Sequence, residues 1–147
     1  MFEYIGWVVL AVLTLLAVKV FKDLNSSGVT VDENIPDVLE IQDFTPKTLA
    51  KYNGTDDKRI LVAVRGKVYD VSGGKKYYGP DGPYAFMAGH DASRALAKHS
   101  FGNENLTPLD EPIDTLEGLN EEEWAALNQW IEFFASKYTF CGNLVNP

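Results

Sequence analysis

The longest apolar run of the chain lies near its N-terminus. Residues 4–20 read YIGWVVLAVLTLLAVKV, in which Lys19 is the only charged residue. Apolar side chains cover every face of this run, whereas a helix that packs on a core keeps a polar stripe. A helix of this length measures about 26 Å, which suits a thin bilayer such as that of the endoplasmic reticulum. The pattern therefore predicts a single transmembrane helix, with residues 1–22 as the anchor.

The flanks of this run favour a retained anchor over a cleaved signal peptide. The segment before it contains Glu3 and no Lys or Arg, whereas a signal peptide begins with a basic region. Lys19 and Lys22 lie at its C-terminal end, and basic residues tend to stay on the cytosolic side. We therefore expect a single-pass protein of the endoplasmic reticulum membrane with its C-terminal domain in the cytosol. Residues 23–42 are rich in Asn, Ser, Gly and Asp and are expected to form a linker.

Short strand-like and helix-like patterns alternate through residues 43–147, which we expect to fold as one domain. The strongest pattern predicts a helix from Asn120 to about Lys137, because Asn120 and Glu123 form a capping box. The mixture of strands and separate helices predicts an α+β domain. The core-facing stripe of the long helix is Trp124, Leu127, Ile131 and Phe134. The other expected elements are a helix at 45–52, a hairpin of strands 60–64 and 67–71, an irregular loop at 77–84, and helices at 85–88 and 92–100, the last capped by Asp91.

The charge and composition of the chain exclude several classes of function. The formal net charge is −8, whereas nucleic-acid binders usually carry a basic stripe, so no nucleic-acid partner is expected. Cys141 is the only cysteine, which excludes an internal disulfide and a cysteine-based metal centre. None of the common nucleotide-binding, hydrolase or calcium-binding motifs occurs, and we expect no enzymatic activity.

Acidic residues gather in the C-terminal third of the chain. Between His99 and Ser136 there are nine Asp and Glu residues and no Lys or Arg. Such a surface could attract a basic partner through long-range electrostatics. It could equally serve to keep the domain soluble, and the sequence leaves both interpretations open.

A tyrosine-rich loop is the main candidate for chemistry. Residues 77–84 read YYGPDGPY, and Gly and Pro can hold such a loop in an irregular conformation. The tyrosines could simply pack, or one of them could bind ferric haem iron as a phenolate. His90 and His99 are more typical of a surface residue and of a helix end than of metal ligands. Basic residues that could pair with carboxylates of a ligand are Lys75, Lys76, Arg94, Lys98 and Lys137.

Three elements follow one another in residues 60–101, VRGKVYDVS, KYYGPDGPY and AGHDASRALA. In these elements, their order and their spacing, the chain resembles the membrane-associated progesterone receptor family. The short chain with its brief C-terminal end most resembles the fungal damage-resistance members. The resemblance implies a cytochrome b5-like haem-binding domain behind a single N-terminal transmembrane helix.

The resemblance also implies a cofactor and its ligands. The cofactor would be haem b, held non-covalently, and Tyr84 matches the axial ligand of its iron. Cytochrome b5 itself uses a His-Pro-Gly-Gly motif and two axial histidines, and neither His90 nor His99 lies in that context. The other cofactor-binding positions implied are Tyr78, Lys137, Tyr138, Asp91 and Arg94.

The function implied by the resemblance is support of other proteins rather than catalysis. The family binds and activates haem-thiolate monooxygenases, of the cytochrome P-450 class, in sterol synthesis, which in a fungus leads to ergosterol. A cytochrome b5-type electron carrier and a steroid-binding or scaffold module are the alternatives. A haem-dependent homodimer is also left open.

Overall fold

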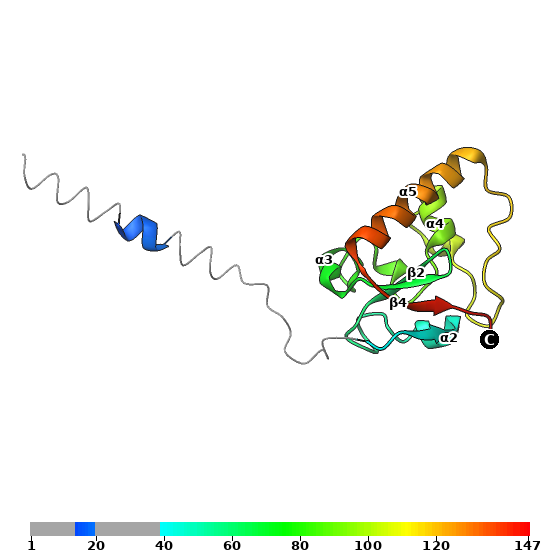
Figure 1. Ribbon diagram of the computed structural model, residues 1–147, viewed down its shortest axis with the longest axis horizontal. Helices are drawn as coiled ribbons and strands as arrows, with labels where there is room; N and C mark the ends of the chain where they lie inside the picture. The colour runs from blue at the N-terminus through cyan, green and yellow to red at the C-terminus, as the bar shows by residue number, and fades with distance from the viewer. Residues whose placement is uncertain (1–13, 20–38) are drawn as a thin grey trace, which may run out of the picture. The chain divides into compact units, whose positions relative to one another are not determined.

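The computed structural model describes residues 14–19 and 39–147 (Figure 1). The chain divides into two units, residues 1–34 and residues 35–147. Of the first unit, residues 14–19 are helical. In the described ranges, no helix has both the length and the apolar character needed to cross a bilayer. Most of the predicted anchor, 1–22, and most of the linker, 23–42, lie outside those ranges.

The second unit mixes helices and strands, which confirms the prediction of an α+β domain. The helix predicted from the capping box runs over Glu121–Lys137, as expected. The elements in chain order are β1 (Gln42–Phe44), α2 (Pro46–Leu49), β2 (Leu61–Val64), β3 (Lys67–Asp70), the 3₁₀ turn η1 (Ser72–Gly74), α3 (Lys75–Tyr78), η2 (Ala85–Met87), α4 (Ser93–Lys98), η3 (Asn103–Asn105), α5 (Glu121–Lys137) and β4 (Thr139–Leu144).

The four strands form one mixed sheet in the order β1-β4-β3-β2. β2 and β3 form the predicted antiparallel hairpin, with Val62 opposite Tyr69. β4 pairs antiparallel with β3 and parallel with β1. The C-terminal strand therefore lies in the interior of the sheet, so the end of the chain is part of the core structure.

Each face of the sheet carries a separate hydrophobic core, because successive strand residues point to opposite sides. On one face Val62 and Val64 pack with residues of α4 and α5, including the fully buried Phe134. On the other face Leu61 and Ala63 pack in a smaller cluster with the α2 residue Leu49 and with residues of β1 and β4. The candidate site lies on the larger, α5-covered side.

The helix starts follow local capping rules. Before α5, the Asn120 side chain accepts the Glu123 N–H at 2.8 Å. Thr45 forms a reciprocal cap with Thr48 before α2, but this helix ends at Leu49 and not at Tyr52. α4 begins at Ser93, which corrects the prediction that Asp91 directly precedes the helix, although the Asp91 carboxylate still accepts the Ser93 N–H at 3.1 Å.

The strands β1 and β4 were not predicted. The β1 segment, QDF, is short, and the β4 segment, TFCGNL, contains a Gly-Asn pair that is typical of turns. Gly142 has φ +150°, and a Cβ there would overlap the carbonyl oxygen of Gln42 in β1. The sequence pattern around Gly142 is typical of a turn, but in the structure the glycine is required because strand β1 approaches it closely.

Candidate functional site

The backbone of the tyrosine-rich loop is fixed by its own hydrogen bonds. α3 ends at Tyr78, so the irregular part of the loop is shorter than the predicted 77–84. The Tyr84 N–H donates to the Tyr77 carbonyl at 2.8 Å and closes the loop. A Cβ at Gly82 would overlap that same carbonyl oxygen. The second glycine of the YGPDGPY run is therefore required for the tight closure that places Tyr84.

Two tyrosines of this loop converge with a third, Tyr138, which follows α5. Tyr78 is 5% exposed, and its ring centroid lies 5.9 Å from that of Tyr84 and 6.0 Å from that of Tyr138. Tyr84 is partly exposed and stacks on Phe101 at 5.7 Å with an interplanar angle of 22°. Phe134 supports the group from the core, 6.2 Å from Tyr78 and 5.4 Å from Tyr138. The structure thus brings together the tyrosines singled out from the sequence.

The tyrosines differ in their chemical surroundings. Burial raises the pKa of Tyr78 far above its ordinary value, and the neighbouring Tyr138, through its charge and a hydrogen bond, raises it further. A smaller contribution of the same sign comes from Tyr84. Tyr78 is therefore a neutral phenol at physiological pH, and a neutral phenol can donate a hydrogen bond to an anionic oxygen nearby.

An open cleft of about 450 Å³ lies next to the tyrosines. This volume is within the range of ordinary ligand pockets. Lys137 stands at the cleft with its ammonium 5.2 Å from the Phe133 ring and 5.7 Å from the Tyr138 ring. The lining consists of Asp70, Ser72, Gly73, Gly74, Tyr77, Lys137, Tyr138 and Thr139.

The donor groups of the tyrosine cluster and of the adjoining cleft fit haem better than a bare metal ion. Within residues 14–19 and 39–147, no group of three or more His, Cys, Asp or Glu side chains could hold a metal. A haem brings four ring nitrogens of its own and needs only an axial donor, which a tyrosine can supply. Tyr84, which lies in the tyrosine cluster and is not among the residues that line the cleft, offers the phenol. The aromatic rings around it offer an apolar wall, and Lys137 at the cleft offers a cation for a carboxylate.

Two of the predicted cofactor-binding residues make other contacts. The Arg94 guanidinium donates to both carboxylate oxygens of Asp114, at 2.6 and 2.9 Å, and to the Glu117 carbonyl at 2.9 Å. The Asp91 carboxylate accepts from the Ser93 hydroxyl at 2.5 Å. Arg94 therefore braces the loop before α5, and Asp91 braces the start of α4. The structure does not place either side chain in the tyrosine cluster.

The Arg94 pair predicts a specific dependence of stability on pH. Arg94 holds the pKa of the Asp114 carboxyl below its ordinary value, foremost by hydrogen bonding. The stabilising effect of the Arg94–Asp114 pair is thus complete at pH values above the pKa that Asp114 has in the unfolded chain. It is lost as the pH falls through the lower pKa that Asp114 has in the folded protein. We expect Asp114→Asn to cost about 1–3 kcal/mol at neutral pH and to reduce the loss of stability in acid. Urea unfolding of both proteins across the acid range measures this, and parallel pH profiles would contradict it.

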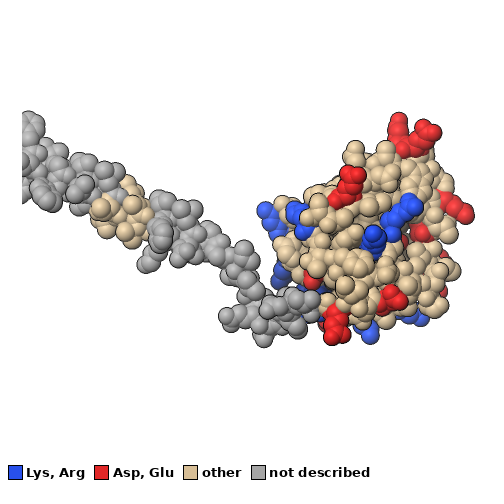
Figure 2. Space-filling model, viewed as in Figure 1, with Lys and Arg blue, Asp and Glu red and all other residues tan. Residues whose placement is uncertain are grey.

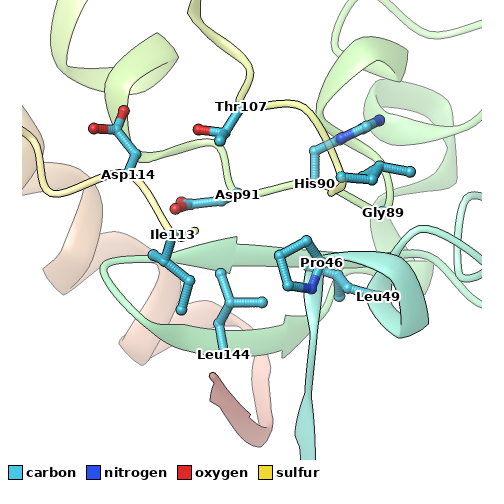
Figure 3. A pocket seen from close by; sticks show the side chains of 10 residues that line it. Pro46, Leu49, Gly89, His90, Asp91, Thr107, Ile113, Asp114 and Leu144 are labelled. Carbon is cyan, nitrogen blue, oxygen red and sulfur yellow. The ribbon is translucent and has the colours of Figure 1, made fainter. Parts of the chain in front are cut away.

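A second, smaller cavity lies on the other side of the sheet (Figure 3). Its volume is about 20 Å³, which is space for roughly one water molecule. His90 lines it together with Asp91 and apolar side chains such as Leu49. His90 is partly buried, which differs from the expected surface position, and burial lowers its pKa. His99 ends α4 with φ +50° and is exposed.

Comparisons with known proteins agree with this architecture. A family model described as a cytochrome b5-like heme/steroid binding domain matches residues 45–138. The cytochrome P-450 regulator dap1 of Schizosaccharomyces pombe is 47% identical over 113 residues, which are 76% of this chain and 68% of that protein. Membrane-associated progesterone receptor component 2 of Homo sapiens is 41% identical over 109 residues, which are 74% of this chain and 48% of that protein. This chain belongs to the membrane-associated progesterone receptor family of cytochrome b5-like domains.

Two solved structures from Arabidopsis show the same fold. A putative steroid-binding protein is 45% identical with a TM-score of 0.62, and the match covers 72% of this chain and 99% of that one. A hypothetical protein with a cytochrome b5 like fold is 42% identical with a TM-score of 0.63, and the match covers 78% and 98%. A cytochrome b5-like fold is therefore shown for most of residues 39–147.

Sequence reasoning missed two residues that lie beside the tyrosine cluster. Phe101 is 66% exposed and covers one face of Tyr84, yet in sequence it is an isolated aromatic after a helix. A Cβ on Gly74 would lie against two of the tyrosines, yet the sequence around Gly74 indicates only the end of a strand. Of the basic residues expected near a ligand, Lys137 lies at the cleft. Arg94 instead pairs with Asp114, and Lys98 pairs with Glu123.

Proposed function

We propose that this protein is a membrane-anchored haem-binding protein that supports cytochrome P-450-class monooxygenases of sterol synthesis, leading to ergosterol in a fungus. The observation that carries the proposal is the convergence of Tyr78, Tyr84 and Tyr138 beside an open cleft with a lysine at its edge. Non-covalent haem b would lie at this cleft, with Tyr84 as the axial ligand of its iron. The protein itself would carry out no enzymatic reaction.

Each side chain of the site has a distinct task in this proposal. When bound, haem supplies a ferric iron that accepts an anionic oxygen donor. Tyr84 would provide that oxygen from the more open side of the cluster. Tyr78, kept neutral by burial, would donate a hydrogen bond toward it. Lys137 would pair with a propionate, and Tyr138 would form an apolar edge of the cleft.

The partner is inferred from relatives and from charge. The name of the Schizosaccharomyces pombe relative is cytochrome P-450 regulator. Figure 2 shows acidic side chains at the end of the domain where α5 begins, and that helix starts with Glu121, Glu122 and Glu123. An acidic patch of this kind would steer a basic surface of a monooxygenase toward the domain. A single-pass anchor in the endoplasmic reticulum would keep the cytosolic domain close to such partners.

The alternatives receive less support from the structure. An electron carrier with two axial histidines would need His90 and His99, but His90 lines the cavity across the sheet and His99 is an exposed helix end. A steroid-binding module would need a large apolar cavity, whereas the cleft of about 450 Å³ is open and has Asp70, Ser72 and Lys137 in its lining. The cavity of Figure 3 holds roughly one water molecule. A haem-dependent homodimer remains a prediction.

The proposal is tested by reconstituting a sterol-demethylating cytochrome P-450 with the full-length protein in membranes. We expect the haem-loaded protein to increase demethylation, because the haem-bound domain is the form that supports the partner. Haem-free protein, prepared in the same membranes, is the control. Equal support from both preparations would instead indicate a scaffold, and no support from either would contradict the proposed partner.

A further inference from the structure

Gly74 lies where two of the site tyrosines meet. It is buried at the end of η1, immediately before α3. A Cβ built on Gly74 would lie 3.2 Å from the Tyr138 hydroxyl oxygen and 3.2 Å from Cδ2 of the Tyr78 ring. Such separations are tighter than an ordinary van der Waals contact. A methyl group at this position would therefore push against both tyrosines at once.

The backbone at Gly74 gives no other reason for a glycine. Its φ and ψ of −100° and 31° are open to residues with a side chain. The Gly74 N–H donates to the Val71 carbonyl at 2.8 Å, and an alanine would keep this bond. Gly73 in the same turn has open space where its Cβ would be. The two neighbouring glycines thus differ in the space available to a methyl group, and only at Gly74 do site tyrosines fill that space.

We propose that Gly74 is a positioning residue of the tyrosine site, whose missing side chain lets the Tyr138 hydroxyl and the Tyr78 ring approach each other. The inference rests on the proposed function, because the two tyrosines form the support of the ligand Tyr84. Their ring centroids are 6.0 Å apart and the ring planes are inclined at 83°. A methyl group at Gly74 would separate them and would move Tyr78 relative to Tyr84.

The first test needs no cofactor and uses urea unfolding of the full-length protein in detergent. We expect Gly74→Ala to raise the unfolding equilibrium constant about tenfold, and the matched Gly73→Ala to change it by less than about threefold. Tyr138→Phe removes the oxygen that a Cβ at Gly74 would touch. In that background Gly74→Ala should cost clearly less, which a double-mutant cycle measures. Equal costs in both backgrounds would overturn the inference.

The second test measures haem binding by Gly74→Ala. Gly74→Ala should lower haem affinity about tenfold, the effect of weakening roughly one hydrogen bond to a charged group. It should keep the tyrosinate absorption and resonance Raman signature, because Tyr84 itself is unchanged. Unchanged haem affinity in Gly74→Ala would overturn the inference about Gly74 but not the proposed function. Loss of the proposed function would appear differently, as a Tyr84→Phe protein that binds haem like the parent.

If Gly74→Ala alone does not fold, the double variant Gly74→Ala with Tyr138→Phe tests whether crowding at the Tyr138 hydroxyl is the cause. Recovery of folding in Gly74→Ala with Tyr138→Phe would support steric positioning, because removing one atom would relieve the crowding. Failure of the double variant to fold, when Tyr138→Phe alone folds, would overturn the inference that Gly74 makes room for the Tyr138 hydroxyl.

Discussion

Replacing Tyr84 by Phe is expected to abolish most haem binding while leaving the fold intact. The change removes one oxygen from a partly exposed ring, and the stack on Phe101 at 5.7 Å is kept. The loss of the iron ligand itself should exceed the roughly 10–100-fold that loss of a supporting residue costs at metal sites. Titration of the haem-free protein with haem, followed by absorption spectroscopy, measures the affinity.

A matched control for this change lies on the opposite face of the sheet. Tyr52 packs edge-on against Phe44 at 5.8 Å in the smaller core. Tyr52→Phe makes the same chemical change away from the cleft and should keep haem affinity. If both variants bind haem like the parent, Tyr84 is not the ligand.

The same experiment distinguishes the tyrosinate from histidine ligation. A protein with two axial histidines would lose its low-spin spectrum when His90 and His99 are replaced by Ala. We expect instead a high-spin ferric spectrum that survives the double histidine replacement and is lost in Tyr84→Phe. The opposite pattern would identify the protein as an electron carrier of the cytochrome b5 type.

The sequence predicted those parts of the fold that depend on local chemistry. The capping box of Asn120 and Glu123 marked the start of α5, and the apolar runs around Gly66 marked the β2–β3 hairpin. Both signals lie within a few residues of the structure they specify. β1 and β4 pair across about a hundred residues of chain, and Gly142 permits that pairing through its contact with Gln42. Such non-local causes leave little trace in a single sequence.

In the candidate site, too, the sequence indicated the features that depend on local residues and not those that depend on distant ones. The glycines and prolines of the YGPDGPY run indicated a fixed loop, and the structure explains Gly82 by the overlap that a side chain would make with the Tyr77 carbonyl. The approach of Tyr138, from the far end of α5, depends on packing that the sequence does not show. Arg94 was grouped with the site by its charge, whereas its partner Asp114 lies twenty residues away and binds it through two hydrogen bonds.

Packing of the site on the domain core centres on Phe134. This ring is 0% exposed and lies 6.0 Å from Tyr69, 6.2 Å from Tyr78 and 5.4 Å from Tyr138. It thus joins the sheet to both supporting tyrosines. Because a close-packed interior does not refill a lost ring, a deletion here leaves a cavity directly beneath the site.

Phe134→Ala is therefore expected to destabilise the haem-free protein by about 3–5 kcal/mol, a large part of the 5–15 kcal/mol typical of a domain. Urea unfolding without cofactor measures this cost. Phe133→Ala is the matched control in the same helix, because that ring is 37% exposed, and it should cost about 1–2 kcal/mol. The haem affinity of folded Phe134→Ala should also fall, since Tyr78 and Tyr138 lose their common support. Equal destabilisation by the two variants would show that Phe134 is not the centre of the core.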